Sequence, residues 1–182
     1  MNRFFVLTGG PGSGKTTLAN ALERNGLHVM PEAGRTVMTA RQATGLPPRG
    51  DDPAHFADLM LALDLENFET ARHLAGPVLF DRGMPDLIGY LRLMGYAVPT
   101  RLFEAAKRHR YNRRIFLAPH WPQIYATDSQ RDQSPAEALE TCLCIAAAYR
   151  ELGYETVELP LCDVVTRAAF VQHVIAGAAP IR

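Results

Sequence analysis

The sequence is poor in cysteine and has no long hydrophobic run. Its three cysteines are Cys142, Cys144 and Cys162, and their spacing fits neither a zinc site nor a CxxC redox motif. We therefore expect no disulfide framework, and we expect small buried side chains in a reducing compartment. The first apolar run covers only residues 4–7, which is too short for a signal sequence or a membrane span. The sequence thus predicts a soluble, cytoplasmic protein without a membrane partner.

An excess of charge is also missing. The chain has 19 lysines and arginines against 19 aspartates and glutamates, so its formal net charge is zero. Because a surplus of positive charge drives non-specific binding to nucleic acids and anionic membranes, this balance gives no general reason to expect either partner. A local arginine stripe would favour nucleic-acid processing as a distant alternative, and it would comprise Arg108, Arg110, Arg113 and Arg114.

The sequence does contain a regular alternation of short apolar runs with helical patterns. Strands are expected over residues 3–8, 27–30, 78–81, 114–118 and 155–159. Helices are expected over residues 15–25, 32–44, 53–75, 85–94, 100–109, 135–152 and 164–175. This alternation predicts an α/β fold with a parallel sheet covered on both faces, whose ligands gather at the carboxyl ends of the strands. The length predicts one domain over residues 1–182.

The strongest motif lies between the first expected strand and the first expected helix. Residues 9–16 read GGPGSGKT, which fits the pattern GxxxxGK[ST]. In this pattern, glycines let backbone N–H groups converge on phosphate oxygens, and the following helix presents its positive end to the same anion. Lys15, one of only two lysines in the chain, would reach the β- and γ-phosphates, and the Thr16 hydroxyl would bind Mg²⁺. We therefore predict a nucleotide-phosphate site at Gly10, Gly12, Ser13, Gly14, Lys15, Thr16 and Thr17.

A second metal ligand is expected at the end of the third strand. Residues 78–81 read VLFD, and P-loop enzymes place an Mg²⁺-binding aspartate in this setting. Asp81 is therefore predicted as a metal ligand and a catalytic residue. The next residue is Arg82 rather than a glutamate that could activate water, and arginine suits phosphate or substrate oxygens. The alternative is that Asp81 and Arg82 form a helix cap and a surface charge before Gly83.

Glu32 and Arg35 follow the second expected strand in the segment PEAGR. Because the carboxyl ends of parallel strands meet at one edge of the sheet, Glu32 should project toward the ligand. A carboxylate there would accept a hydroxyl proton or bind the acceptor directly, although a helix N-terminal charge would look the same in sequence. We predict that Glu32, Arg35 and Arg82 bind the substrate, with Glu32 as a candidate catalytic base.

A polar loop and a capping box follow the fourth strand. The loop covers residues 119–133 and is followed by SPAE at residues 134–137, a helix start with proline at the first position. Its length and polarity predict a lid, over about residues 119–134, that excludes water and supplies an arginine to the transferring phosphoryl group. Arg131 is the candidate catalytic arginine, and a solvated surface charge is the alternative.

Four segments in a fixed order resemble those of the NadR-like AAA-domain group, small predicted ATPases and kinases related to the nicotinamide riboside kinase domain of NadR. The segments are GGPGSGKTTL, PEAGR, FDRGMPD and RDQSPAEA, and the similarity spans residues 4–175. It implies a three-layer P-loop NTPase fold like that of nucleoside and nucleotide kinases, with a five-stranded parallel sheet in the order 2-3-1-4-5 and a helical lid. It also implies that Lys15, Thr16 and Asp81 bind ATP and Mg²⁺, but it does not imply a particular acceptor.

These features together predict an ATP- and Mg²⁺-dependent kinase that phosphorylates a hydroxyl group of a small molecule, such as a nucleoside. The prediction rests on the arginine in place of a hydrolytic glutamate and on the two charged motifs after the second and third strands. The alternative is a nucleotide-dependent regulatory ATPase that has no small-molecule acceptor and signals to a protein partner. Lys15 would be essential under both hypotheses, whereas loss of Glu32 would abolish function only in a kinase.

Overall fold

The chain alternates strands and helices as its hydrophobic pattern predicts. The computed structural model describes residues 3–124 and 134–178. The strands are β1 (Phe4–Gly9), β2 (His28–Met30), β3 (Val78–Asp81), β4 (Arg114–Ala118) and β5 (Glu155–Glu158). The helices are α1 (Lys15–Arg24), α2 (Ala33–Ala43), α3 (Pro53–Arg72), α4 (Met84–Leu93), α5 (Thr100–Arg108), α6 (Pro135–Glu151) and α7 (Val164–Ala178), with a 3-10 turn at Pro122–Ile124.

The five strands form one parallel sheet in the order β2-β3-β1-β4-β5, which confirms the predicted topology. β1 lies at the centre, where Leu7 is in register with Asp81 of β3 and with Phe116 of β4. The carboxyl ends of these strands therefore meet at one edge of the sheet. The segments after β1, β2 and β3 leave the sheet along this edge, where an open parallel sheet binds its ligands.

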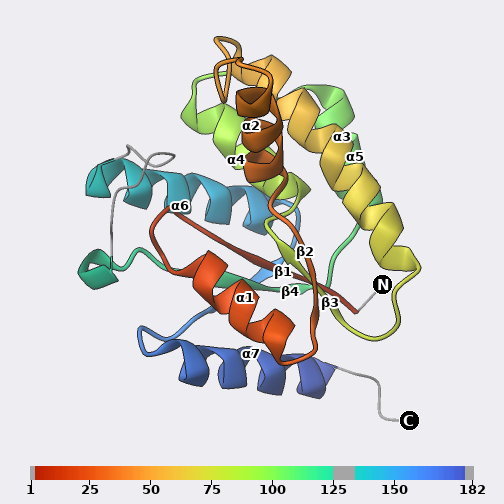
Figure 1. The fold of residues 1–182 in the computed structure, drawn as a ribbon, viewed down its shortest axis with the longest axis vertical. Coiled ribbons are helices and arrows are strands. Elements are labelled where there is room, and N and C mark those ends of the chain that lie inside the picture. Colours follow the sequence, from red (N-terminus) through yellow and green to blue (C-terminus); the bar gives the residue numbers. More distant parts are fainter. Residues whose placement is uncertain (1–2, 125–133, 179–182) are drawn as a thin grey trace.

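Alternating side chains of the strands build two hydrophobic cores, one on each face of the sheet. Phe4 and Val6 pack with residues of α3, α4 and α6, whereas Phe5 and Leu7 pack with residues of α1 and α7. Because successive strand side chains point to opposite faces, continuous apolar runs such as FFVL serve both cores. Figure 1 shows α1 and α7 on one side of the sheet and the remaining helices on the other, so the fold has three layers.

Helices α4 and α6 pack closely because a glycine lies at their contact. A Cβ atom at Gly89 would lie only 2.8 Å from the Cα atom of Ile145, so a larger residue would force the two helices apart. The close approach brings Tyr149 of α6 within hydrogen-bond distance of Asp86 of α4. This contact matters below because Asp86 belongs to the candidate site.

The predicted element bounds agree with the structure to within about three residues. β3 and β4 have the predicted bounds, and α7 extends three residues beyond the predicted end. The predicted capping box is present, because Ser134 and Glu137 cap α6 reciprocally. At the start of α3, the side chain of Asp52 accepts the N–H of Ala54. Among the described residues, no helix is long and apolar enough to span a membrane.

Candidate functional site

The loop after β1 contains a backbone conformation at Gly14 that favours glycine. Gly14, the residue before α1, has a φ of 77°, in the left-handed region that side chains with a Cβ atom rarely adopt. A Cβ atom there would also lie 2.8 Å from Nη1 of Arg167. The N-terminus of the ten-residue helix α1 therefore opens directly onto the loop, as an anion site requires.

Lys15 lies buried inside this loop. Its Nζ atom donates to the carbonyl oxygen of Gly10 at 2.5 Å and to Oγ of Ser13 at 3.2 Å, and the residue is only 6% exposed. Burial, followed by the positive charge of Arg82, lowers the pKa of Lys15 to about 7. A bound polyphosphate would add negative charge beside the ammonium group and so favour its charged form.

Asp81 ends β3 at the same edge of the sheet and is also buried, at 7% exposure. Its Oδ1 atom is buried and has no hydrogen-bond partner in the described part of the chain. Burial, together with the negative charge of Glu32, raises the pKa of Asp81 to about 6. Asp81 and Thr16 line one surface hollow, so a residue with a carboxyl group and a residue with a hydroxyl group border the same space.

Arg82 joins three segments of the site. Its guanidinium group donates to Oε1 of Glu32 at 2.9 Å, to the carbonyl oxygen of Gly9 at 3.1 Å and to Oδ1 of Asp86 at 3.0 Å. Among the described residues, Arg82 is the one non-glycine residue with a positive φ, 72°. This left-handed conformation costs about 1–2 kcal/mol, and the hydrogen bonds of the side chain hold it in place. The alternative interpretation of Arg82 as a solvated surface charge is therefore wrong.

Asp86 is the acidic centre of this network, and the sequence interpretation did not include it. Its Oδ1 accepts from Oγ1 of Thr8 at 2.5 Å and from Arg82, and its Oδ2 accepts from the N–H of Gly83 at 3.0 Å and from the hydroxyl of Tyr149 at 2.6 Å. Four donors from β1, from α6 and from the loop between β3 and α4 thus converge on one carboxylate. The available signal was an acidic residue three positions after a glycine at a helix start.

Glu32 and Arg35 lie where the second strand was predicted to deliver them. Burial opposes ionisation of Glu32, but the positive charges of Arg82 and Lys15 outweigh this effect and lower the pKa of its carboxyl group. Nε of Arg35 lies 3.8 Å from Oε2 of Glu32, and the Arg35 side chain is 42% exposed. Glu32 is therefore held as a carboxylate, whereas Arg35 remains at the rim.

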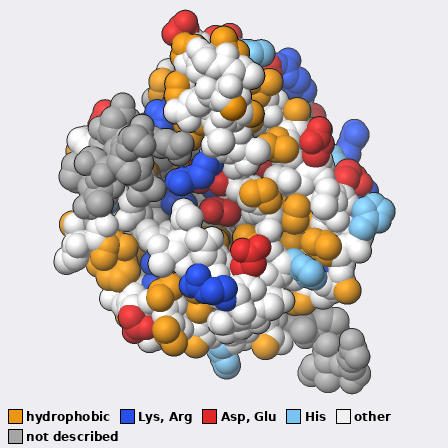
Figure 2. Space-filling view, viewed as in Figure 1, with side chains coloured by type: hydrophobic (Ala, Val, Ile, Leu, Met, Phe, Trp, Pro, Cys, Tyr) orange, Lys and Arg blue, Asp and Glu red, His pale blue; other side chains and the backbone are white. Residues whose placement is uncertain are grey.

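One cavity of about 290 Å³ connects the loop around Lys15 with these charged residues. It is lined by residues 11–17 on one side and by Glu32, Arg35, Arg82 and Asp86 on another. Its remaining wall is mostly apolar but also includes Arg49 and Asp64. Phe56 and Tyr90 belong to this wall, and their rings meet edge to face with their centroids 6.0 Å apart. In Figure 2, basic and acidic side chains lie beside one another in a hollow between α2 and α1.

Two further buried charged residues were not predicted from the sequence. Asp64 of α3 lines the cavity and is 4% exposed. Arg167 of α7 is 3% exposed and donates from Nη1 to the carbonyl oxygen of Ser13 at 3.1 Å, and its guanidinium carbon lies 5.5 Å from the ring centroid of Trp121. Asp64 lies between apolar residues on one face of α3, and Arg167 lies in a largely apolar helix, so the sequence offers little signal for either.

Most of the predicted site residues therefore lie around one cavity. Lys15, Thr16, Glu32, Arg35 and Arg82 line the cavity, and Asp81 lies in the adjoining hollow. Arg131 and most of the predicted lid lie outside the described residues. Within the described part, no group of three histidine, cysteine or acidic residues is arranged to hold a metal ion alone.

Comparisons with known proteins agree with this architecture. A family model described as an AAA domain matches residues 4–167. No curated protein matches the chain at the sequence level. Among solved structures, a deoxyadenosine kinase from M. mycoides with bound dCMP and dCDP has a TM-score of 0.68 at 10% identity, with 96% of this chain and 99% of that chain covered.

Two thymidylate kinases also have similar folds. The enzyme from Ehrlichia chaffeensis has a TM-score of 0.64 at 15% identity, and 94% of this chain and 97% of that chain are covered. The enzyme from Candida albicans has a TM-score of 0.65 at 11% identity, with coverages of 96% and 91%. At these identities the comparisons establish the fold alone, which is that of P-loop nucleoside and nucleotide kinases.

Proposed function

The chain belongs to the AAA domain family, and we propose that it is a small-molecule kinase that transfers the terminal phosphoryl group of ATP to a hydroxyl group. The observation that carries this proposal is the single cavity between the phosphate-binding loop and the Glu32–Arg82 pair. A phosphoryl donor and an acceptor must be held next to each other, because most of the catalysis in such sites comes from positioning and electrostatics. This cavity is lined by Lys15 on one side and by Glu32 and Arg82 on another, so it offers charged groups to both.

The donor side of the cavity suits a nucleotide polyphosphate. The backbone N–H groups of the loop and the start of α1 would bind the phosphate oxygens, and Lys15 would stabilise the negative charge of the β- and γ-phosphates. The buried Asp81 oxygen without a partner and the Thr16 hydroxyl fit a divalent cation, for which Mg²⁺ prefers oxygen ligands. When bound, Mg²⁺ would neutralise charge on the phosphates during transfer.

The acceptor side suits a hydroxyl group attached to a partly apolar body. Glu32 is held as a carboxylate by Arg82, so it would accept a hydrogen bond from the acceptor hydroxyl. The hydroxyl oxygen attacks the γ-phosphorus, the bond from phosphorus to the β–γ bridging oxygen breaks, and ADP leaves. The hydroxyl proton passes to Glu32, which acts as the base. The apolar wall around Phe56 and Tyr90 would contact the rest of the acceptor. A nucleoside-like molecule has both the hydroxyl group and a ring that could pack against this wall.

The lid remains part of the proposal. Arg131 would approach the transferring phosphoryl group from the segment after β4, where an arginine stabilises the charge of the transition state. The arginine after Asp81 supports transfer over hydrolysis, because Arg82 occupies the position at which a glutamate could activate water and its guanidinium group is already bound by Glu32 and Asp86.

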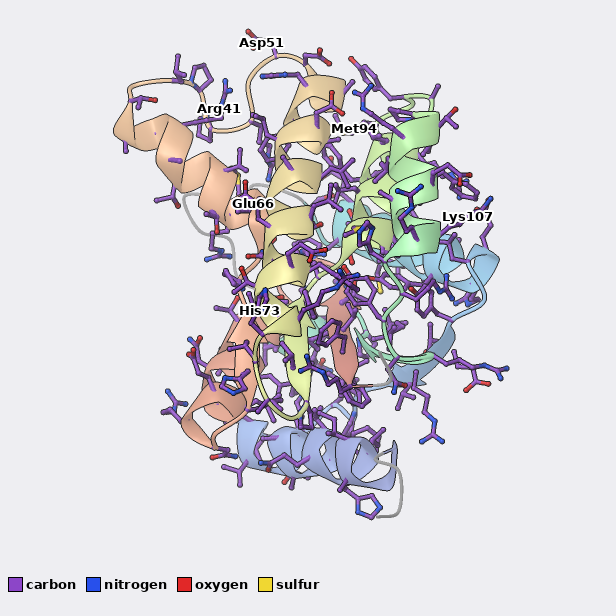
Figure 3. The ribbon with its side chains drawn as sticks, turned by 90° about the vertical axis from the view of Figure 1, so that its right-hand side faces the viewer. Arg41, Asp51, Glu66, His73, Met94 and Lys107 are labelled. Atoms are coloured by element: carbon purple, nitrogen blue, oxygen red, sulfur yellow. The ribbon has the colours of Figure 1, made fainter. Side chains whose placement is uncertain are left out.

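An acceptor screen tests the proposal. ADP release should be measured with ATP and Mg²⁺ over a panel of nucleosides, amino sugars and polyols, for the wild type and for Lys15→Ala. The matched control is Lys107→Ala, because Lys107 is the other lysine and lies on α5, outside the cavity (Figure 3). We expect at least one compound to raise ADP release in the wild type and in the control but not in Lys15→Ala. If no compound raises the rate above that with water alone, the chain is not a small-molecule kinase.

A further inference from the structure

Asp64 interrupts the apolar face of α3 that borders the cavity. Phe56, Met60, Asp64 and Phe68 follow one another at intervals of four residues, so they lie along one face of the helix. Each of the four is buried, with Asp64 at 4% exposure. Three of these positions are apolar core residues, and the fourth is a carboxylic acid that lines the cavity.

The buried acid has no partner that explains its presence. Its Oδ2 atom is buried and has no hydrogen bond within residues 3–124 and 134–178. The nearby cation Arg82 is already bound by Glu32 and Asp86. Burying a polar group without a partner costs about 1–3 kcal/mol, and an apolar residue at this position would avoid that cost. An acid that remains unpaired in a cavity wall is therefore best explained by a ligand that completes its hydrogen bonds.

The surroundings keep Asp64 uncharged near neutral pH. Burial, together with the negative charges of Asp86 and Glu32, raises the pKa of Asp64 to about 8 despite the opposing charge of Arg82. A protonated carboxyl group donates one hydrogen bond and accepts another from adjacent oxygens. Such a pair of groups complements a planar amide or amidine edge, in which an N–H donor lies next to an acceptor atom.

We propose that Asp64 determines the specificity of the acceptor pocket by pairing with an N–H donor and an adjacent acceptor atom on a planar ring. Phe56 and Tyr90 form the neighbouring apolar wall against which such a ring packs. The acceptor thus has an aminopurine-like or aminopyrimidine-like body at Asp64 and a hydroxyl group near Glu32. This inference rests on the proposed function, because it assigns the cavity to a phosphoryl acceptor.

Matched pairs of ligands test the inference by binding rather than by turnover. Adenosine and purine riboside differ only in the amino group of the ring, and cytidine has a corresponding analogue without its amino group. Calorimetric titration of each compound should use the wild type, Asp64→Asn and Asp64→Leu. The control is Glu66→Gln, since Glu66 is exposed on the same helix and does not line the cavity (Figure 3).

We expect the wild type and Glu66→Gln to bind at least one amino nucleoside about tenfold more tightly than its amino-free analogue. Asp64→Asn should retain part of this preference, because an amide also donates and accepts, whereas Asp64→Leu should bind both compounds of the pair equally. Asp64→Leu should also unfold at no lower temperature than the wild type, so a lost preference would not reflect misfolding.

The outcomes separate this inference from the proposed function. Equal binding of both compounds by the wild type, no binding of any amino nucleoside, or an unchanged preference in Asp64→Leu would each overturn the role of Asp64. Phosphoryl transfer is scored separately in the acceptor screen. A chain that binds amino nucleosides through Asp64 but phosphorylates none contradicts the kinase proposal alone, and a chain that phosphorylates acceptors without regard to the amino group contradicts only the role of Asp64.

Discussion

The two sides of the cavity are built in different ways. On the proposed phosphate side, one contiguous segment over residues 9–17 supplies the loop, the lysine and the hydroxyl group. On the acceptor side, Glu32, Asp64, Arg82 and Asp86 come from separate elements, and their side chains depend on one another for charge and position. A substitution on the phosphate side should therefore affect mainly the substituted residue's own contacts. A substitution on the acceptor side should also disturb the charged residues that contact the substituted one.

The largest effect should come from the phosphate side. Lys15→Ala should lower acceptor phosphorylation about 10³-fold, because the ammonium group stabilises charge that develops in the transition state. Steady-state rates with saturating acceptor would measure the loss, and Lys107→Ala should leave the rate unchanged. An equal loss in both lysine variants would show that Lys15 has no special place in the cavity.

The next largest effect should separate phosphoryl transfer, which needs the acceptor side, from ATP binding, which needs the phosphate side. Glu32→Gln should reduce phosphoryl transfer about 10²-fold, because the amide cannot accept the hydroxyl proton. The affinity for ATP and Mg²⁺ should stay nearly constant, since residues 9–17 are unchanged. Single-turnover rates measure phosphoryl transfer, and titration with ATP measures the affinity. The control is Glu104→Gln on the surface of α5. If Glu32→Gln lost its ATP affinity, the two sides would not be separate in function.

Asp86 should reveal the network character of the acceptor side. Asp86→Ala leaves Arg82, Thr8 and Tyr149 without their shared acceptor, so unfolding free energy should fall by about 3 kcal/mol. Asp58→Ala, which breaks the surface ion pair with Arg101, should cost less than about 1 kcal/mol. Denaturant unfolding of both variants measures the difference, and equal costs would contradict the network.

The last of these effects concerns pH and the buried acid. The pKa of Asp64 is raised from 3.8 to about 8 on folding, so the folded state binds its proton more tightly than the unfolded state. Its contribution to stability is complete below pH 4 and is lost as the pH rises to about 8. Between these limits the free energy of unfolding of the wild type should fall relative to that of Asp64→Asn by about 1.4 kcal/mol for each pH unit.

Unfolding free energies at intervals between pH 4 and pH 9 would provide this comparison. The difference between wild type and Asp64→Asn isolates Asp64 from the other titrating groups, because Lys15, Asp81 and Glu32 are present in both proteins. A difference that stayed constant across this range would mean that Asp64 is charged in the folded protein at neutral pH.

The same contrast explains what could be predicted from the sequence. The position of residues 9–17 between a strand and a helix was predictable, because these residues are adjacent in the chain and match a known loop pattern. Glu32 and Asp81 were predictable as well, since each follows a recognisable strand. The contacts of Asp86 were not predictable, because its partners are far away in the chain: Thr8 lies 78 residues from it, and Tyr149 lies 63 residues from it. The position of Asp64 beside the cavity was not predictable either, because it depends on how α3 packs.

Asp86 also illustrates how a correct local prediction can hide a function. The segment DLIG at residues 86–89 was correctly predicted to lie in a helix, and that placement gave no reason to expect a ligand-facing acid. Only the packing of α4 against α6, with Gly89 at the contact, brings Tyr149 to its carboxylate. Tertiary packing, rather than residue type or spacing, thus determines which acids belong to the site.

The fate of the terminal phosphoryl group tests the central claim most directly. The wild type should be incubated with ATP labelled at the γ-phosphorus, Mg²⁺ and the best acceptor from the screen, and the labelled products should be separated. If the cavity joins donor and acceptor as described, the label appears on the acceptor in equal amount to the ADP formed, and Glu32→Gln greatly slows its appearance. Label recovered only as inorganic phosphate would contradict the account, because it would show that water, and not a bound hydroxyl group, receives the phosphoryl group.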